Sequence, residues 1–267
     1  MPMLHVILVQ TALHWEDRKG NLEALGKKLD RLSGPAHLVV LPEMFTTGFT
    51  MNARPLAEPT EGPTFDWMAR QASRLNAVVT GSMIAEENGL YYNRLLWVRP
   101  DGTYEKYDKR HLFTLAGEHE HYTPGQQRLV VELEGWKVLP LICYDLRFPV
   151  WARNTENYDL LIYTANWPEM RRQAWRTLLA ARAIENQSYT LGVNRVGTDG
   201  NGFPYTGDSS AFDYAGEELL HAAQVEGLFT VQLSYEKQQD FRSKLQFLAD
   251  RDRFVLTKPS HLKKNKS

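Results

Sequence analysis

The stretch Val138-Leu-Pro-Leu-Ile-Cys143-Tyr-Asp-Leu-Arg147-Phe-Pro149 joins an unbroken apolar run to a polar turn, and it holds the only cysteine of the chain. The apolar half predicts a buried strand, and the polar half predicts a sharp turn with a helix beginning near Arg147. A thiol at such a turn faces outward like a nucleophile, beside helix N–H groups that favour the thiolate. The competing interpretation is a small buried hydrophobe, because free cysteines are usually buried and inert.

Strand-like apolar runs alternate with helical periodicity along the rest of the chain. Strands are predicted at residues 4–9, 37–41, 77–82, 91–98, 103–107, 129–133, 136–142, 160–164, 189–194, 209–214 and 227–233. Helices are predicted at residues 22–32, 65–75, 170–186 and 236–248, with Thr64 as the N-cap of the second and Trp175, Leu178 and Leu179 on the buried side of the third. This alternation favours an α/β fold in which helices cover the sheet, and hairpin turns make the sheet mixed. Periodicity alone leaves open whether there is one sheet or two packed sheets.

Length and composition favour a single soluble domain over residues 1–267, with a core at about 4–248 and a polar C-terminal tail. Of the 267 residues, 43% are hydrophobic and 24% charged, and no linker, repeat or composition shift marks a boundary. The net charge of −1 gives no indication of nucleic acid or an anionic membrane as partner. The basic tail, residues 258–267, is predicted to be a frayed, solvated end.

The single cysteine excludes an internal disulfide and fits a reducing compartment. The N-terminus has no basic n-region and is too short to span a bilayer, so it is interpreted as a first strand rather than a signal peptide. A cytoplasmic protein is therefore expected.

Two charged residues beside strand ends are candidates for chemistry. Glu43 follows the apolar run 39–41 beside Pro42 and Phe45, and poor solvation there would suit its carboxyl group to proton transfer. Lys109, in the string from Tyr107 onward, would stabilise a thiolate or a developing oxyanion. The alternatives are a solvated loop carboxylate and a charged surface turn. Each signal is weak alone, and the ordered set of Glu, Lys and Cys is strong.

Six motifs in the same order resemble the nitrilase superfamily of carbon–nitrogen hydrolases, over about residues 5–247. The matching strings are Leu41-Pro-Glu43-Met-Phe45, Asp108-Lys109-Arg-His-Leu-Phe113, Ile142-Cys143-Tyr-Asp-Leu-Arg147-Phe-Pro149, Thr164-Ala-Asn166-Trp167-Pro168, Ala181-Arg-Ala-Ile-Glu185-Asn186 and Asn194-Arg195-Val-Gly-Thr-Asp199-Gly-Asn-Gly202. The segment Gly117-Glu118-His119-Glu120-His121-Tyr122 and the pair Asn166-Trp167 are similar to the bacterial omega-amidase branch.

The resemblance implies a four-layer αββα sandwich with two mixed β-sheets, a homodimer, and no metal or other cofactor. It implies a catalytic triad in which Glu43 is the general base, Cys143 the nucleophile, and Lys109 holds the oxyanion together with the backbone N–H of Tyr144. A second active-site glutamate is either Glu118 or Glu120. Glu118 is favoured because its spacing to Pro124-Gly125 matches the branch, and it would orient Lys109 and the substrate amide.

For the omega-amidase branch, the resemblance implies a small-molecule amide as substrate, a monoamide of a 2-oxo dicarboxylic acid such as 2-oxoglutaramate or 2-oxosuccinamate. Such a pocket must hold a distal carboxylate, for which Arg147 and Arg195 are the candidates, with Tyr144, Asn166 and Trp167 shaping the wall. The alternatives are a scaffold salt bridge from Arg147 to Asp145 and a packing role for Trp167.

Four alternative functions and an alternative role for the histidines remain open at this point. The same chemistry would serve an N-carbamoyl amidohydrolase, a nitrilase or an amidase for a deaminated peptide, and a non-catalytic scaffold is the alternative from another class. His111, His119 and His121 lie close in sequence and invite a zinc site or a Cys–His pair. Packing or hydrogen bonding is favoured for these histidines, with His121 at the entrance.

Overall fold

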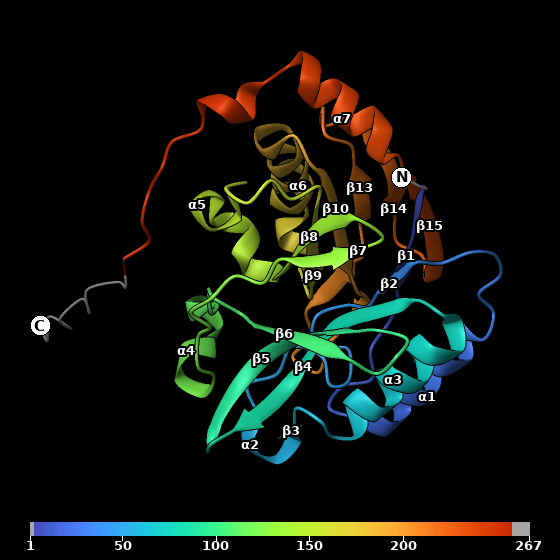
Figure 1. Ribbon diagram of the computed structural model, residues 1–267. Helices are drawn as coiled ribbons and strands as arrows, with labels where there is room; N and C mark the ends of the chain where they lie inside the picture. The colour runs from blue at the N-terminus through green and yellow to red at the C-terminus, as the bar shows by residue number, and fades with distance from the viewer. Residues whose placement is uncertain (1–2, 258–267) are drawn as a thin grey trace, which may run out of the picture.

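Two mixed β-sheets stack face to face and carry helices on their outer sides (Figure 1). The computed structural model describes residues 3–257, and the basic tail predicted at residues 258–267 lies outside them. Within the described residues, no helix is both long and apolar enough to cross a bilayer.

The first sheet contains seven strands, and the parallel strands lie at its centre. Its order is β15 (Gly227–Leu233), β1 (Leu4–Gln10), β2 (Leu38–Val40), β4 (Val78–Glu87), β5 (Leu90–Val98) and β6 (Tyr104–Asp108), with β3 (Glu58–Pro59) also paired to β4. β1, β2 and β4 are parallel, and the hairpins β4–β5 and β5–β6 are antiparallel. Two reversals give β6 the direction of β2 and β4, so the chain leaves all three at the same end.

The second sheet contains six strands in the order β14 (Glu218–Ala222), β13 (Ser209–Phe212), β10 (Tyr189–Asn194), β9 (Leu160–Ala165), β8 (Trp136–Ile142) and β7 (Val131–Leu133). β8, β9 and β10 are parallel. A separate hairpin, β11 (Val196–Thr198) with β12 (Pro204–Thr206), follows β10.

Side chains of β1 alternate between two cores. Val6 and Leu8 pack in the core between the sheets, whereas Ile7 and Val9 pack against helices. Both faces of the strand are therefore dry, which explains an apolar run without polar alternation.

Helices cover both outer faces, which gives the predicted αββα layers. α1 (Arg18–Leu29) and α3 (Pro63–Leu75) pack on the first sheet, and α5 (Pro149–Ala152) and α6 (Arg172–Asn186) on the second. The remaining helical elements are α2 (Ala53–Leu56), α4 (Glu118–His121), α7 (Tyr235–Lys244) and the 3-10 turns η1 (Thr114–Ala116), η2 (Cys143–Arg147), η3 (Glu169–Arg171) and η4 (Phe247–Asp250). The α/β class with mixed sheets is confirmed.

Several element boundaries differ from the prediction, and three of them bear on caps or on the site. Gly62, not Thr64, is the N-cap of α3, because Thr64 donates both its N–H and its hydroxyl to the buried carboxylate of Glu58. The helix expected near Arg147 is replaced by the tight turn η2 and the one-turn helix α5. The final helix ends at Lys244 rather than near residue 248.

Candidate active site

Cys143 lies where β8 turns into η2, and its backbone is left-handed, with φ of 43°. This conformation is costly for a residue with a side chain, so the surroundings must hold it. Buried Asp145 does so by accepting hydrogen bonds from the N–H of Ile142 at 3.1 Å, the N–H of His111 at 3.0 Å and the hydroxyl of Tyr107 at 2.7 Å. The thiol is 9% exposed and lines a pocket.

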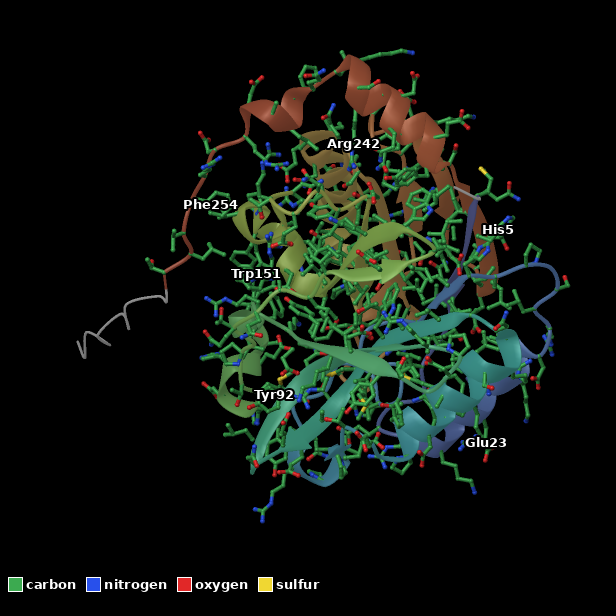
Figure 2. All side chains as sticks on the ribbon, viewed as in Figure 1. His5, Glu23, Tyr92, Trp151, Arg242 and Phe254 are labelled. Carbon is green, nitrogen blue, oxygen red and sulfur yellow. The ribbon has the colours of Figure 1, made fainter. Side chains whose placement is uncertain are left out.

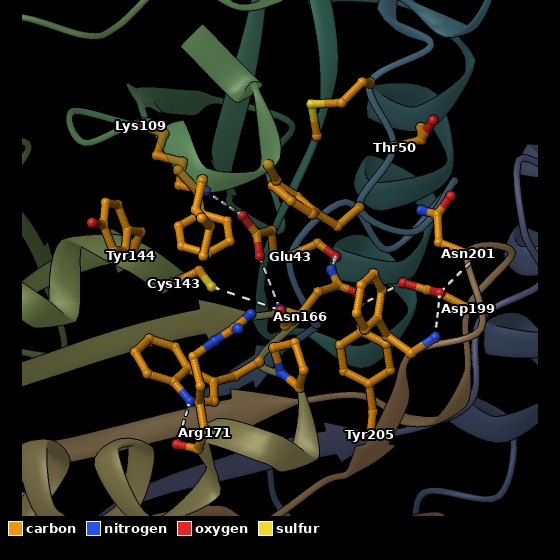
Figure 3. Close-up of a pocket in the computed structure, with 18 of the residues that line it drawn as sticks. Glu43, Thr50, Lys109, Cys143, Tyr144, Asn166, Arg171, Asp199, Asn201 and Tyr205 are labelled. Carbon is orange, nitrogen blue, oxygen red and sulfur yellow. Dashed lines mark hydrogen bonds and ion pairs between the residues drawn. The ribbon is translucent and has the colours of Figure 1, made fainter.

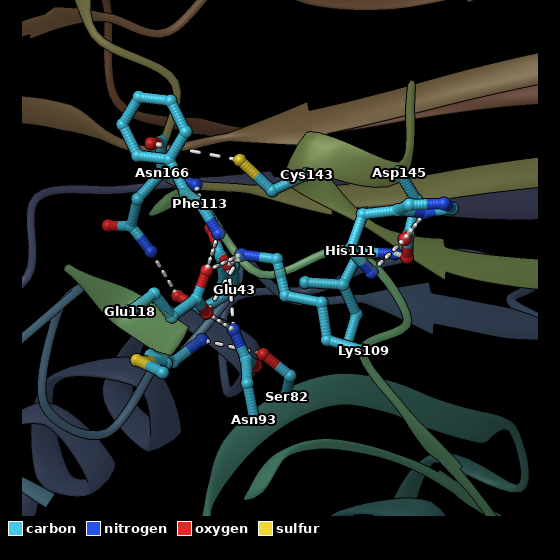
Figure 4. Close-up of polar contacts among 12 residues, drawn as sticks. Glu43, Ser82, Asn93, Lys109, His111, Phe113, Glu118, Cys143, Asp145 and Asn166 are labelled. Carbon is cyan, nitrogen blue, oxygen red and sulfur yellow. Dashed lines mark hydrogen bonds and ion pairs between the residues drawn. The ribbon is translucent and has the colours of Figure 1, made fainter. Parts of the chain in front are cut away.

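Lys109 lies between two buried carboxylates (Figure 4). Its Nζ donates to Glu43 Oε1 at 2.8 Å and to both carboxylate oxygens of Glu118 at 3.0 Å. Lys109 is 1% exposed, and the two glutamates are fully buried. Asn93 reinforces the cluster by donating to Glu43 at 2.8 Å and to Glu118 at 3.3 Å.

Asn166 connects this cluster to the thiol. Its backbone N–H donates to Glu43 Oε2 at 2.8 Å, and its own carbonyl oxygen lies 3.9 Å from Cys143 Sγ (Figure 4). The ends of β2, β6 and β8 thus bring the three residues of the predicted triad to one place, and the end of β9 adds Asn166. Of the two candidates for the second glutamate, Glu118 contacts Lys109, whereas Glu120 is exposed.

Burial and charge set the protonation of the cluster. Burial alone would lower the pKa of Lys109, but the carboxylates of Glu118 and Glu43 raise it above its ordinary value, so the ammonium persists. Burial raises the pKa of Glu118, and the nearby charge of Glu43 adds to that rise, while Lys109 opposes it.

The thiol of Cys143 is neutral at rest. Burial raises its pKa well above the ordinary value, the negative charge of Glu43 adds to this effect, and Lys109 opposes it. The expectation that helix N–H groups favour the thiolate is therefore wrong, because a short 3-10 turn replaces the helix and desolvation dominates.

The pocket above the thiol has a volume of about 560 Å³. Four of the predicted substrate-binding residues line it: Tyr144, Arg147, Asn166 and Trp167. Figure 3 shows Tyr144 and Asn166 on either side of Cys143. Arg147 pairs with no acid among the described residues, and its guanidinium lies 5.0 Å from the centroid of the Trp167 ring.

Arg195 does not line the pocket, which corrects its prediction as a carboxylate ligand. Its guanidinium donates to the backbone carbonyl oxygens of Leu13 at 3.1 Å, Thr198 at 3.2 Å and Val196 at 3.3 Å. The side chain is buried and holds the β11–β12 hairpin to the body of the protein.

The histidines have structural positions. His111 Nδ1 lies 2.8 Å from Asp145 Oδ1, and its ring stacks on Phe148 at 3.7 Å between centroids. His119 and His121 are exposed on α4, and neither belongs to the pocket wall. The expected place of His121 at the entrance is thus not what the structure gives.

Several wall residues were missed by the sequence reasoning. They are Trp15, Glu16, Phe49, Thr50, Met51, Asn52, Phe113, Leu115, Ala116, Pro168, Arg171, Asp199, Asn201, Phe203 and Tyr205. Most lie in irregular loops or in the β11–β12 hairpin, where periodicity carries no signal. Asp199 and Asn201 lie within a motif string that was quoted for the resemblance, so that string was the available clue.

Comparisons with known proteins agree with this geometry. The family model for carbon-nitrogen hydrolases matches residues 6–243. Omega-amidase YafV of Yersinia enterocolitica is 47% identical over 261 residues, covering 96% of this chain and 100% of that protein. The 2-oxoglutaramate amidase of Bacillus subtilis (strain 168) is 32% identical over 227 residues, covering 83% of this chain and 87% of that protein.

A solved structure extends the likeness to the fold. The CN-hydrolase superfamily protein of Xanthomonas campestris, which carries an arsenic adduct in its active site, is 43% identical with a TM-score of 0.94, covering 96% of this chain and 100% of that one. The chain belongs to the carbon–nitrogen hydrolase family, also called the nitrilase superfamily. It is a hydrolase of the amidase type.

Proposed function

We propose that this amidase is an omega-amidase, which hydrolyses the terminal amide of 2-oxo dicarboxylic acid monoamides such as 2-oxoglutaramate and 2-oxosuccinamate. The observation that carries this proposal is one pocket wall on which a neutral thiol, a buried lysine–glutamate pair and the free guanidinium of Arg147 come together. The thiol, the lysine and the glutamate supply acyl-transfer chemistry, and the guanidinium supplies a partner for a distal carboxylate.

Acylation begins with proton transfer from Cys143 to Glu43. The sulfur attacks the amide carbonyl carbon and forms a C–S bond, while the carbonyl electron pair moves to oxygen. The Lys109 ammonium and the N–H of Tyr144 stabilise that oxyanion. When the C–N bond breaks, protonated Glu43 gives its proton to the departing ammonia, and a thioester remains on Cys143.

Deacylation uses the same groups, with water as the nucleophile and Cys143 as the leaving group. Glu43 takes a proton from a water molecule, and the resulting hydroxide equivalent attacks the thioester carbonyl carbon. The C–S bond breaks, and the proton returns to sulfur. The dicarboxylic acid leaves, and the resting thiol is restored.

Glu118 acts through Lys109. It is fully buried, it grips Nζ with both carboxylate oxygens, and it does not belong to the pocket wall. We therefore propose that Glu118 orients the Lys109 ammonium toward the oxyanion and does not contact the substrate amide.

Ammonia release from a panel of amides tests the substrate class. The protein should release ammonia from 2-oxoglutaramate far faster than from N-carbamoyl amino acids, deaminated peptides or simple nitriles. A simple nitrile has no carboxylate that could pair with the guanidinium of Arg147. Preference for one of those three would transfer the protein to the matching branch of the family. Absence of turnover on every compound, with a folded protein, would support the scaffold alternative.

We also propose a cytoplasmic homodimer. A free cysteine without a disulfide partner supports the compartment. Exposed apolar side chains on α5, α6 and the segment after α7 support a subunit contact: Val150, Ile184, Leu245, Phe247 and Phe254. Phe254 is labelled in Figure 2. Sedimentation analysis should give twice the monomer mass, and Ile184→Glu should shift the protein toward monomer.

A further inference from the structure

A second arginine, Arg171, shares the pocket wall with Arg147. The two side chains come from different elements, Arg147 from η2 and Arg171 from η3. Figure 3 shows Arg171 rising into the pocket from the side of the second sheet. Neither guanidinium forms an ion pair within residues 3–257, and the side-chain hydrogen bond of Arg171 goes only to the thioether of Met170, at 3.3 Å.

Each guanidinium is held over an aromatic ring that also lines the pocket. Arg147 lies 5.0 Å from the Trp167 centroid, and Arg171 lies 5.1 Å from the Phe113 centroid. Such contacts hold a cation in place without neutralising it. Both positive charges therefore remain available to a ligand.

The rings themselves are tied to the reacting groups. The backbone N–H of Phe113 donates to Glu118, and its ring meets that of Tyr144, the residue after Cys143, edge-on at 4.9 Å. Trp167 follows Asn166, and its indole N–H donates to the carbonyl oxygen of Arg171 at 2.8 Å. Trp167 thus lies under one arginine and anchors the backbone of the other.

The acids of the pocket wall contrast with the two arginines. Asp199 accepts hydrogen bonds from the N–H groups of Asn201 and Phe203 and from the hydroxyl of Tyr205. Glu16 accepts from Thr50 and Asn52. Acceptor oxygens of both carboxylates are thus occupied by neutral donors of the protein, whereas both guanidinium groups keep N–H donors that can bind an anion.

We propose that Arg171 is a second substrate-binding residue, which works with Arg147 to bind the distal carboxylate together with the adjacent 2-oxo oxygen. A 2-oxo acid presents three coplanar acceptor oxygens, which suits two guanidinium groups. A 2-amino acid amide places an ammonium in the same position, where two cations repel it. This inference rests on the proposed function and deepens it, because it names the group that selects 2-oxo over 2-amino substrates.

Steady-state kinetics of Arg171→Gln test the assignment. For 2-oxoglutaramate we expect KM to rise roughly ten- to a hundredfold, the loss typical of a hydrogen bond to a charged group, with kcat changed little. The kinetic constants for pentanamide, which has no carboxylate, should stay unchanged. The preference for 2-oxoglutaramate over glutamine should fall, and Arg171→Lys should restore part of it.

Arg176→Gln is the matched control, since Arg176 lies on α6 and pairs with Glu218 at 2.8 Å on the surface, away from the pocket wall. A KM for Arg171→Gln within twofold of this control, or an equal rise for pentanamide, would overturn the inference. Failure of the wild-type protein to act on 2-oxoglutaramate would instead overturn the proposed function.

Calorimetry gives a readout that needs no turnover. In a Cys143→Ala background, 2-oxoglutarate should bind roughly ten- to a hundredfold more weakly after Arg171→Gln, and glutarate, which has no 2-oxo oxygen, should be weakened less. Equal affinity before and after the substitution would contradict the assignment. If Arg171→Gln does not fold, the same comparison with Arg171→Lys decides, with a smaller loss expected.

Discussion

The thiol of Cys143 is subject to opposing influences on its pKa. Burial and then the charge of Glu43 raise it, while the Lys109 ammonium lowers it. Since the net shift is upward, the resting sulfur is protonated at neutral pH, and a base must act at the moment of attack. In the proposed mechanism, Cys143 would therefore stay protonated until Glu43 takes the proton as a substrate binds.

Substitution of Glu43 by Gln should therefore separate thiol reactivity from turnover. Removing the negative charge lowers the pKa of Cys143, so alkylation by iodoacetamide at neutral pH should become faster than in the wild-type protein. Amide hydrolysis should be abolished, because the proton acceptor is gone. Alkylation rates measured over a range of pH check the predicted fall in the thiol pKa, and ammonia release checks the predicted loss of hydrolysis.

Lys109→Gln is the opposing control. Loss of the cation should raise the pKa of the thiol further and slow alkylation. It also leaves two buried carboxylates without a compensating positive charge, which should cost about 3–5 kcal/mol of stability. If both variants shifted the alkylation profile in the same direction, the electrostatic account of the thiol would be wrong.

At the scale of single residues, the sequence predicts which side chains meet at the site, but it does not predict how their surroundings change their pKa values. Glu43, Lys109 and Cys143 stand beside strand ends in a recognisable order, and all three meet in the structure. The raised pKa of the thiol could not be predicted, because it depends on Glu43 lying nearby in space and on a turn too short to act as a helix. Arg171 carried no local signal at all.

The turn η2 gives Cys143 its position, and Asp145 is the residue that holds the turn. Asp145→Ala would leave three buried donors without an acceptor, from Ile142, His111 and Tyr107. We expect a loss of about 3 kcal/mol in the free energy of unfolding. Activity should fall at least tenfold, because the thiol loses its fixed geometry.

Chemical denaturation and kinetics of the same samples check this prediction. Tyr107→Phe is the milder control, since it removes one donor and leaves Asp145 in place. An Asp145→Ala protein as active as the wild type would show that the strand end alone positions the sulfur.

Contact between α6 and the second sheet depends on Gly192 in β10. A Cβ atom there would lie 2.5 Å from Leu179 Cδ1 and 2.6 Å from Trp175 Cζ2. Gly192→Ala should therefore destabilise the protein by about 2 kcal/mol or more through overpacking. Urea denaturation measures the loss, and Gly192→Ala combined with Leu179→Ala should lose less stability than the sum of the two single losses, because the clash is relieved; strictly additive losses would argue against the steric cause.

Among the elements, regular strands and long helices could be predicted, and the short irregular ones could not. β1, β8, β9 and α6 follow from periodicity, since both faces of the strands are dry and one face of the helix is apolar. The hairpin β11–β12 escaped prediction because its residues are mostly polar and turn-forming. The role of Arg195 was misjudged for the same reason, as its partners are the backbone carbonyls of that hairpin and of a distant loop.

At the scale of the whole molecule, buried Asp208 connects three elements, since its carboxylate contacts side chains of α6, β12 and β14. It accepts hydrogen bonds from Thr206 at 2.7 Å and Arg172 at 2.9 Å, and it lies 2.8 Å from Nε2 of His221. Burial opposes its ionised form, but these partners together lower the pKa of Asp208 below its ordinary value of 3.8. Ionisation is therefore more favourable in the folded state than in the unfolded state.

The sign of the pH effect follows from that direction. A lowered pKa gives stability that is complete above the ordinary value and is lost as the pH falls through the folded-state value. The gap in unfolding free energy between the wild-type protein and Asp208→Asn should still be present at about pH 5 and should then shrink toward about pH 2. Urea unfolding at several pH values measures this gap, and a gap that widened in acid would contradict the account.

The layered architecture was predicted through resemblance rather than through periodicity. The alternating pattern indicated helices on sheets, but only the packing of Val6 and Leu8 between two sheets settles that there are two. The pairing of strands remote in sequence, such as β15 beside β1, depends on contacts that a local pattern does not encode.

Mass spectrometry of acid-quenched protein, taken during turnover of 2-oxoglutaramate, tests most directly whether Cys143 is the nucleophile of a thioester route. The account predicts a transient mass increase equal to the substrate minus ammonia, mapped to the peptide that holds Cys143 and lost together with turnover in Cys143→Ala. An adduct on another residue, or ammonia release that persists in Cys143→Ala, would contradict it.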